Sequence, residues 1–495
     1  MTTAVTANAV ASVVGIKPNF VDLRGGNVLN LEQRITVVGQ GATAATYSTD
    51  KRTVTSAVEV GQTYGFGSPV HLAAQQLLPE NGDGAQALPI TINPLEDAGT
   101  GVAAAGSITP SGTQSGAGSY IVRVNNIDSA AFVIADGELG TDLEARITDA
   151  INANVDMPVI AAAGADVVDL TAKWAGPTGN DIYVEVIGPD NGITFAVVQP
   201  TGGLVNPNID DALTAIGTVW ETMLLNCLDV ADTDTLDKYE TWGVGRWQAT
   251  TKKPAIVFTG NTATTVAAAT AVSDARPDDY INGQLVAPGS KDLPFVVAAR
   301  QLARIAVQAT NNPPTSYQAL QATGLTPGAD ADQWNDTDRN LAIKAGSSTI
   351  EVKDTVVELA DIVTFYHPTG VPNPEYRYVV DIVKLQNIIY NLNLIFATPN
   401  WAGKPLIPDE QPTANANARQ PKGAKAAVAL LIDNLALAAV ISDPAFAKSS
   451  IVAAISSTNP KRLDIAFTVK LSGNTNIISI DLNFGFYFGV VTPAA

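Results

Sequence analysis

The chain has very few of the side chains on which most catalytic and metal sites are built. Its 495 residues contain one cysteine, Cys227, and two histidines, His71 and His367. A single thiol excludes an internal disulfide, and a lone cysteine in an apolar stretch is ordinarily a core residue. A hydrolytic triad, a histidine-based zinc site or a Cys–His dyad would need one of the two histidines beside the right partners. We interpret both as structural or solvated, and we predict no metal, no cofactor and no enzymatic activity.

Two segments match ligand-binding motifs only in part. Residues 39–44 follow a strand-like run and fit the pattern G-x-G-x-x-A, but the residues after them form a poor helix and present no helix N-terminus to a pyrophosphate. Several aspartates between residues 330 and 338 have the composition of a calcium loop. Trp334 stands where such a loop needs a ligand, and its required glycine is missing. Neither segment is predicted to bind a ligand.

Charged residues are also scarce. They make up 16% of the chain, against 46% apolar residues, a balance typical of a packed globular protein. The first basic residue is Lys17, so the basic start of a signal peptide is missing. The longest apolar run, residues 426–441, is too short to cross a bilayer and contains Asp433. These features predict no membrane insertion.

The charge that is present is distributed unevenly. The net charge is −19, and residues 81–240 contain 23 acidic residues and four basic ones, so that the rest of the chain is neutral. Such an acidic region argues against nucleic acid binding. Residues 411–480 have the opposite bias, with seven basic residues and three acidic ones. This basic stretch either faces an acidic partner or is simply a solvated surface, and the second interpretation is the more common one.

The last thirty residues carry the most informative pattern. Apolar residues occur at every second position in residues 463–471 and again in residues 478–488, on either side of a Gly/Asn break that contains Gly473. An alternation with period two predicts strands with one apolar face, and the break predicts a hairpin. The outer edge of this hairpin would be uncovered, and an unpaired strand edge invites pairing with another chain. We therefore expect strand addition through the apolar face, which comprises Ile478, Ile480, Leu482, Phe484, Phe486 and Phe488.

The order of these patterns predicts a multidomain protein of mixed α+β and α/β class. We expect a discontinuous core domain with terminal β-strand arms, an inserted acidic β-rich domain and a small α/β layer. Residues 96–118, rich in Gly, Ser, Thr and Ala, are interpreted as a linker, and residues 444–456 as one helix. The predicted boundaries are 1–30 for an N-terminal extended arm, 31–95 for the first part of the core, 96–205 for the outer insertion, 206–345 for the α/β domain, 346–475 for the second part of the core, and 476–495 for the C-terminal arm.

Several segments resemble the tail sheath proteins of contractile-tailed bacteriophages, most closely those of the Mu-like branch. They are spread over most of the chain and follow one another in the order found in that family. The segments that carry the resemblance are residues 34–40 (a strand), 59–72 (the FG-x-GS helix start), 175–186 (the Gly-x-x-Gly-Asn strand entry), 360–365 with 376–385 (the "vTTY" strand and the next helix), and 461–471 with 478–488 (the closing strands). The family often has a basic residue before the vTTY strand, where this chain has Leu359-Ala360-Asp361.

The resemblance implies a structural virion protein. In that family, subunits form stacked sixfold rings around a tail tube, and terminal arms of neighbouring subunits add strands to one another's sheets. The sheath contracts on a signal from the baseplate and drives the tube through the host envelope. The implied partners are other copies of the chain, the tail tube protein, and baseplate and tail terminator proteins, with assembly in the cytoplasm of the host bacterium.

The resemblance and the residue patterns together assign three sets of residues. Strand addition in the first arm is assigned to Val13, Val14 and Ile16. Hinges are assigned to Gly25, Gly26 and Gly473, because glycine tolerates many backbone conformations. Contact with the tube is assigned to Arg419, Lys422, Lys425 and Lys448.

Two other classes of function stay open. A host-receptor or glycan-binding surface protein of a virion would suit an acidic β-rich insertion. Such proteins usually bind through exposed aromatic side chains on loops, and residues 81–170 contain only Tyr120 and Phe132. An enzyme is the third alternative, but the sequence offers no acid–base constellation beyond ordinary carboxylates.

Overall fold

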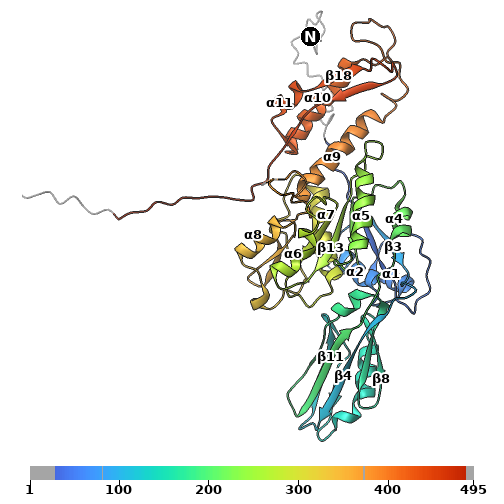
Figure 1. Ribbon diagram of the computed structural model, residues 1–495, viewed down its shortest axis with the longest axis vertical. Coiled ribbons are helices and arrows are strands. Elements are labelled where there is room, and N and C mark those ends of the chain that lie inside the picture. The colour runs from blue at the N-terminus through green and yellow to red at the C-terminus, as the bar shows by residue number, and fades with distance from the viewer. Residues whose placement is uncertain (1–27, 81, 372–373, 487–495) are drawn as a thin grey trace, which may run out of the picture. The chain divides into compact units, whose positions relative to one another are not determined.

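The computed structural model describes residues 28–80, 82–371 and 374–486. These residues form two compact units, whose elements are labelled in Figure 1. The larger unit comprises residues 30–389 and 471–486, and the smaller one residues 28–29 and 390–470. The long helix α9 (Val379–Phe396) contributes residues to both.

A six-stranded sheet forms the centre of the larger unit. Its strands lie in the order β14-β13-β12-β1-β3-β2, and all are parallel except the edge strand β2. Every residue of the five parallel strands is buried, as expected of strands that are covered on both faces. The six strands are β1 (Ile35–Gln40), β2 (Arg52–Val54), β3 (Ile90–Leu95), β12 (Met223–Asn226), β13 (Ile256–Asn261) and β14 (Asn282–Val286).

Helices cover both faces of this sheet. Helices α2 and α7 share a core cluster with Val37 of β1, whereas α4 and α5 share another with its neighbour Val38. Successive residues of a strand point to opposite faces, so the two clusters lie on opposite sides of the sheet. The predicted α/β layer is therefore confirmed. The helices of this part are α1 (Ala57–Tyr64), α2 (Pro69–Leu77), α4 (Asp210–Ile216), α5 (Thr233–Trp247), α6 (Val266–Asp274), α7 (Pro294–Asn311) and α8 (Asp336–Lys344), with a 3-10 turn at Asp330–Asp332.

Two antiparallel sheets are inserted between β3 and β12. The first has the strand order β11-β4-β9-β8 and the second β10-β5-β6, with β7 also paired to β5. Val102 and Leu204 exchange two backbone hydrogen bonds, at 3.0 and 3.1 Å, so the chain enters and leaves the insertion at one place. The insertion contains β4 (Ala103–Gly112), β5 (Gly118–Val124), β6 (Ile127–Asp128), β7 (Phe132–Ile134), α3 (Glu144–Asn152), β8 (Val159–Ala163), β9 (Val168–Ala175), β10 (Val184–Ile187) and β11 (Ile193–Thr201), with 3-10 turns at Gly140–Asp142 and Pro177–Asp181.

The interpretation of residues 96–118 as a linker is wrong. Ten of them form β4, which lies between β11 and β9 in the middle of a sheet. Small residues are needed there, because a Cβ atom on Gly106 would lie only 2.5 Å from the carbonyl oxygen of Val198. Composition alone does not distinguish a flexible linker from a strand whose neighbours leave no room for side chains.

The insertion shares its core with the α/β part of the unit. Trp174 of β9 is fully buried and packs edge-on against Phe295 of α7, with the ring centroids 6.2 Å apart. Asn125 donates to the backbone oxygen of Lys291 at 2.8 Å. Lys291 also forms an ion pair with Glu185 at 2.6 Å. The insertion is thus packed on the rest of the unit and not merely tethered to it.

The segment after α8 extends the edge of the central sheet. Ser348 forms a parallel bridge with Leu285 of β14, and the Phe365 N–H donates to the carbonyl oxygen of Asn282 at 2.8 Å. Between these two points lies a hairpin, made of β15 (Ile350–Lys353) and β16 (Val356–Leu359). The vTTY-like residues 360–365 are therefore an edge segment of the sheet.

The smaller unit combines helices with a two-stranded antiparallel sheet. Strands β18 (Val452–Ile455) and β19 (Leu463–Ala466) form this sheet, and helix α10 packs against both. The prediction of one helix over residues 444–456 is wrong, because α11 ends at Ser449 and the β-branched residues that follow pair as β18. The other elements are α10 (Pro421–Leu437), α11 (Pro444–Ser449), β17 (Ile441–Ser442) and β20 (Lys470–Leu471).

Helix α9 is the one helix of the described chain that is long and apolar enough, by length and composition, to cross a membrane. Half of this segment is buried within the protein. It also contains Lys384, which is fully buried and hydrogen-bonded inside the larger unit. These features indicate a core helix.

Candidate assembly site

The C-terminal segment exposes six large apolar side chains. Their exposed fractions lie between 75% and 88%, and they belong to Ile477, Ile478, Ile480, Leu482, Phe484 and Phe486. From Ile478 onward they alternate with Ser479, Asp481, Asn483 and Gly485. Residues 472–486 form no helix or strand with the rest of the described chain. A chain segment with one apolar and one polar face, and no strand partner in the described part of its own molecule, is suited to pair with another molecule.

The predicted C-terminal hairpin is not formed. The first of its two strands, β19, pairs with β18 instead, and places Leu463 opposite Ile455. The break between the two runs does not turn the chain back. It is attached to the larger unit, since the Lys384 ammonium donates to the backbone oxygen of Ser472 at 2.6 Å and to Asn474 Oδ1 at 2.9 Å.

Of the other residues assigned to the arms, the structure describes only Gly473. Gly473 is exposed, and no atom lies within 4 Å of the position that its Cβ would take, so packing does not require a glycine there. Its role as a hinge stays a prediction. Six of the assigned residues lie outside the described part of the chain: Val13, Val14, Ile16, Gly25, Gly26 and Phe488.

The sheet of β18 and β19 offers strand edges in the smaller unit. Within the described residues each of these strands has one ladder partner, which leaves its other edge unpaired. Val452, at the start of β18, is 63% exposed. A sheet of only two strands is marginally stable on its own and gains from an added strand. It is a second candidate surface for strand addition.

The four basic residues assigned to the tube all belong to the smaller unit, and two of them serve its internal structure. Lys448 of α11 pairs with Asp433 of α10 at 2.7 Å. Arg419 donates to the carbonyl oxygens of Asn400, at 2.5 Å, and of Ala416, at 3.1 Å. Lys448 therefore joins α11 to the C-terminal part of α10, and Arg419 holds the loop that precedes this helix.

Lys422 and Lys425 form an exposed basic patch at the start of α10. Lys422 donates to the backbone oxygen of Asp409 at 3.0 Å, and both lysines are exposed. The first turn of this helix contains no acidic residue. The helix dipole favours negative charge at this end, so two lysines there are electrostatically unfavourable for the isolated helix. The Asp409 carboxylate, which accepts from the Lys422 backbone N–H at 2.8 Å, already offsets part of this cost, and an anionic partner would offset more of it.

The two histidines are held by backbone groups. His71 is 1% exposed, its Nδ1 accepts from the Gly67 N–H at 3.0 Å, and its Nε2 lies 3.9 Å from Asp156. His367 Nδ1 lies 2.5 Å from the carbonyl oxygen of Phe365. These positions agree with the structural interpretation of both residues.

Neither partial motif has the geometry of a ligand site. Gly39 lies against Cys227, where a Cβ atom would come within 2.7 Å of the cysteine Cβ, so this glycine serves packing. In the aspartate-rich segment, Trp334 donates from its indole nitrogen to the carbonyl oxygen of Thr264 at 2.7 Å. Within the described ranges, no group of three or more His, Cys, Asp or Glu side chains could hold a metal ion.

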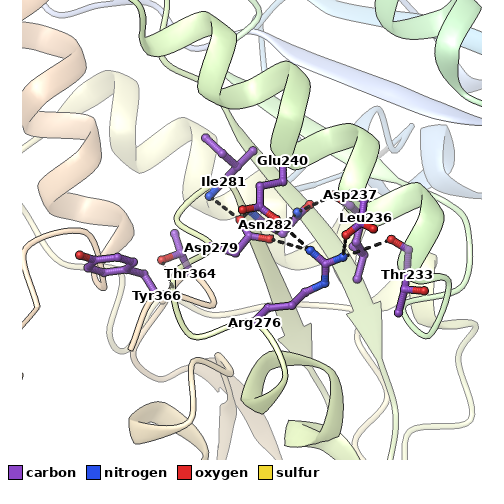
Figure 2. A network of polar contacts seen from close by, with 10 residues as sticks. All are labelled: Thr233, Leu236, Asp237, Glu240, Arg276, Asp279, Ile281, Asn282, Thr364 and Tyr366. Atoms are coloured by element: carbon purple, nitrogen blue, oxygen red, sulfur yellow. Dashed lines mark hydrogen bonds and ion pairs between the residues drawn. The ribbon is translucent and has the colours of Figure 1, made fainter. Parts of the chain in front are cut away.

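A charge network joins α5 and the segment after α6 to the edge of the central sheet, and no local pattern in the sequence indicates it. Figure 2 shows Arg276 directed at three carboxylates: Asp237, Glu240 at 3.0 Å and Asp279 at 3.5 Å. Asp279 accepts from the backbone and the side chain of Asn282, the first residue of β14. Burial raises the pKa of both Glu240 and Asp279, the latter against its hydrogen bonds with Asn282. The network fixes the strand edge on which residues 360–365 lie.

The sequence is similar to that of a known tail sheath protein. No protein-family model matches the sequence. The chain is 26% identical, over 313 residues, to the Mu-like prophage FluMu tail sheath protein of Haemophilus influenzae. The predicted resemblance to a Mu-like tail sheath protein is confirmed. The match covers 61% of the chain and 63% of the relative, so the chain spans less than two thirds of that protein's length.

Solved structures of two sheath tail proteins are also similar. The protein from Listeria innocua has a TM-score of 0.49 at 10% sequence identity, covering 90% of the chain and 94% of that protein. The protein from Desulfitobacterium hafniense has a TM-score of 0.45 at 12% identity, covering 93% of the chain and all of that protein.

The segments that resemble tail sheath proteins have structural roles in the larger unit. Asn180, in the Gly-x-x-Gly-Asn segment, exchanges two hydrogen bonds with the backbone of Gly203 at the base of the insertion. In the vTTY-like segment, Thr364 donates from its hydroxyl to the carbonyl oxygen of Tyr376 at 2.8 Å. Asp361, where the sheath family often has a basic residue, accepts from Gln318 and from Asn476. The sheath-like segments thus join elements that are far apart in the sequence.

Proposed function

We propose that the chain is the subunit of a contractile tail sheath, which surrounds a tail tube and drives it through a host envelope. The similarity to the FluMu tail sheath protein is the observation that carries this proposal. The exposed apolar face of residues 477–486 supports it, because a subunit that links to others needs surface that its own fold leaves free. The protein is then a virion component, assembled in the host cytoplasm in sixfold rings, and its partners are other copies, the tube, the baseplate and the tail terminator.

Strand addition explains how subunits stay joined while they move. Each backbone hydrogen bond contributes about 0.5–1.5 kcal/mol net, and burying one large apolar side chain contributes about 1.5–3 kcal/mol. A segment of ten residues can therefore attach one subunit firmly to another. These hydrogen bonds join only the arm of a subunit to its neighbour. The body of the subunit is not held by them, so the bodies can rotate as rigid units while the arm stays attached. Contraction then needs only the release of a kinetically trapped extended state.

Removal of residues 477–495 tests the proposal. We expect the full chain to form tubes in negative-stain images, and the shortened chain to remain a folded monomer. The described apolar side chains of the removed segment are at least 75% exposed, so their loss leaves the core intact. Discrete compact particles of the full chain that bind a glycan or a host surface would support the receptor-binding alternative instead.

The basic patch gives a separate test of contact with the tube. Lys422→Glu combined with Lys425→Glu should lower assembly on added tubes, and should leave self-assembly without tubes unchanged. Lys461→Glu is the matched control, because Lys461 is an exposed lysine elsewhere in the same unit. Tube-dependent assembly that is equal in the patch variant and the control would contradict the assignment of Lys422 and Lys425 to the tube face.

A further inference from the structure

The C-terminal arm begins at a buried ammonium group. Lys384 of α9 is fully buried. Its Nζ atom donates to Asp381 Oδ1 at 2.9 Å, to the backbone oxygen of Ser472 at 2.6 Å and to Asn474 Oδ1 at 2.9 Å. An ammonium group has three N–H donors, so each of them has an acceptor. Two of the three acceptors belong to residues 472–476, which we call the arm root.

Other elements of the larger unit hold the same five residues. Asn474 Nδ2 donates to the backbone oxygen of Pro314 at 2.7 Å. Asn476 Nδ2 donates to Asp361 Oδ1 at 3.2 Å, and this oxygen also accepts from Gln318 at 2.7 Å. No hydrogen bond is described for residues 477–486, and their large apolar side chains are at least 75% exposed. The attachment of the chain therefore ends abruptly at Asn476.

We propose that Lys384 is a positioning residue for the C-terminal arm, and that the arm turns about the backbone bonds that follow Asn476. Release of the arm root would leave a buried ammonium group without two of its acceptors, which is unfavourable. The first bonds beyond Asn476 carry no such restraint. Gly473 lies inside the held stretch, so the pivot is not at that glycine. This inference deepens the proposed function: a fixed arm root limits the directions in which the arm can search for another subunit, which lowers the entropic cost of pairing.

Spin labels on the full-length monomer can test this arrangement. The only native cysteine, Cys227, is buried, so a thiol reagent will label an introduced cysteine selectively. Thr475→Cys places a label on the exposed side of the arm root, and Ser479→Cys places one on the polar face beyond it. We expect a restricted spectrum at position 475 and a mobile spectrum at position 479.

Removal of the ammonium group should abolish this difference. Lys384→Met keeps a similar side-chain length, and we expect the label at position 475 to lose its restricted component while the label at 479 is unchanged. Asn474→Ala is the second variant, because it removes contacts from the arm side and leaves α9 intact if Lys384→Met impairs folding. Lys344→Met, on the exposed lysine that ends α8, is the matched control and should have no effect. A label at 475 that stays restricted in both Lys384→Met and Asn474→Ala would overturn the proposal.

Assembly provides an independent readout. Lys384→Met should lower the yield of tubes, whereas Gly473→Ala should leave it unchanged, because the position of the added methyl group is open. The opposite result, tubes lost in Gly473→Ala and kept in Lys384→Met, would also overturn the proposal. If the unmodified chain forms no tubes at all, the sheath function fails, but the label spectra still decide whether Lys384 holds the arm root.

Discussion

At the scale of single residues, burial sets the state of the few titratable groups with catalytic potential. His71 is buried beside the insertion, and burial lowers its pKa to about 4, against the raising effect of the Asp156 carboxylate and with a further lowering by Lys173. Burial also lowers the pKa of Lys173 to about 8. The imidazole ring is therefore neutral at neutral pH, as its acceptance of the Gly67 N–H requires.

The lowered pKa of His71 makes stability depend on pH. An imidazole in the unfolded chain titrates near 6.5, so between about pH 6.5 and 4 the unfolded state binds a proton that the folded state does not. The contribution is complete above this window and is lost as the pH falls through it, by roughly 3 kcal/mol in total. Urea unfolding measured from pH 4 to 7 should show a smaller slope of stability against pH for His71→Gln. An unchanged slope in His71→Gln would contradict the prediction.

At the scale of elements, periodicity identified strands and helices but not their partners. The short run at residues 34–40, which shows no apolar–polar alternation in its centre, predicted β1 because a strand that is buried on both faces does not need alternation. The alternation at residues 463–471 correctly indicated a strand, yet its partner is β18, since period two fixes a face and not a neighbour. Strand β4 was missed because its small residues are required by the close approach of the β11 backbone, and β11 is distant in the sequence.

The candidate site was predictable only in part for the same reason. The apolar face of the C-terminal arm follows from local alternation, and its exposure agrees with that pattern. The role of Lys384 does not follow from any local pattern, because 88 residues separate it from Ser472. Its one local signal is that a lysine stands in an otherwise largely apolar helix. Such a buried charge needs hydrogen-bond acceptors from other parts of the chain, and only the three-dimensional structure identifies them.

The alternation of the arm predicts an effect that depends on the face. Phe484→Ser should weaken assembly by about 10- to 100-fold, because about 1.5–3 kcal/mol of apolar burial is lost at each added strand. Asn483→Ser, the same new residue one position earlier, should have little effect. Both variants should keep the thermal stability of the monomer, since Phe484 is 84% exposed and Asn483 is exposed as well. Critical concentrations for tube formation measure the difference, and equal values for the two variants would argue against a one-faced strand.

At the scale of the whole molecule, the acidic insertion is part of a larger cooperative structure. Its two sheets share one continuous cluster of buried residues with α2 and α7, and Trp174 lies where the two parts meet. The contacts of Lys291 with Asn125 and Glu185 add polar links across the same boundary. An insertion that was only tethered could unfold alone, whereas one that shares its core should unfold together with the body that it packs on.

A substitution deep in the insertion can therefore be detected from outside it. Phe132 of β7 is 4% exposed and stacks on Tyr120, and Phe132→Ala should lower the free energy of unfolding by about 3–5 kcal/mol. With Trp174 and Trp401 replaced by Phe, neither the insertion nor the smaller unit holds a tryptophan, and fluorescence reports on the body through Trp220, Trp242, Trp247 and Trp334. In that background we expect Phe132→Ala to move the body's transition to lower denaturant. Val133→Ala, on the same strand but at a position 60% exposed, should leave it in place. If Phe132→Ala left the body's transition unmoved, the substitution would have destabilised the insertion alone. The insertion would then be a domain that unfolds independently of the body.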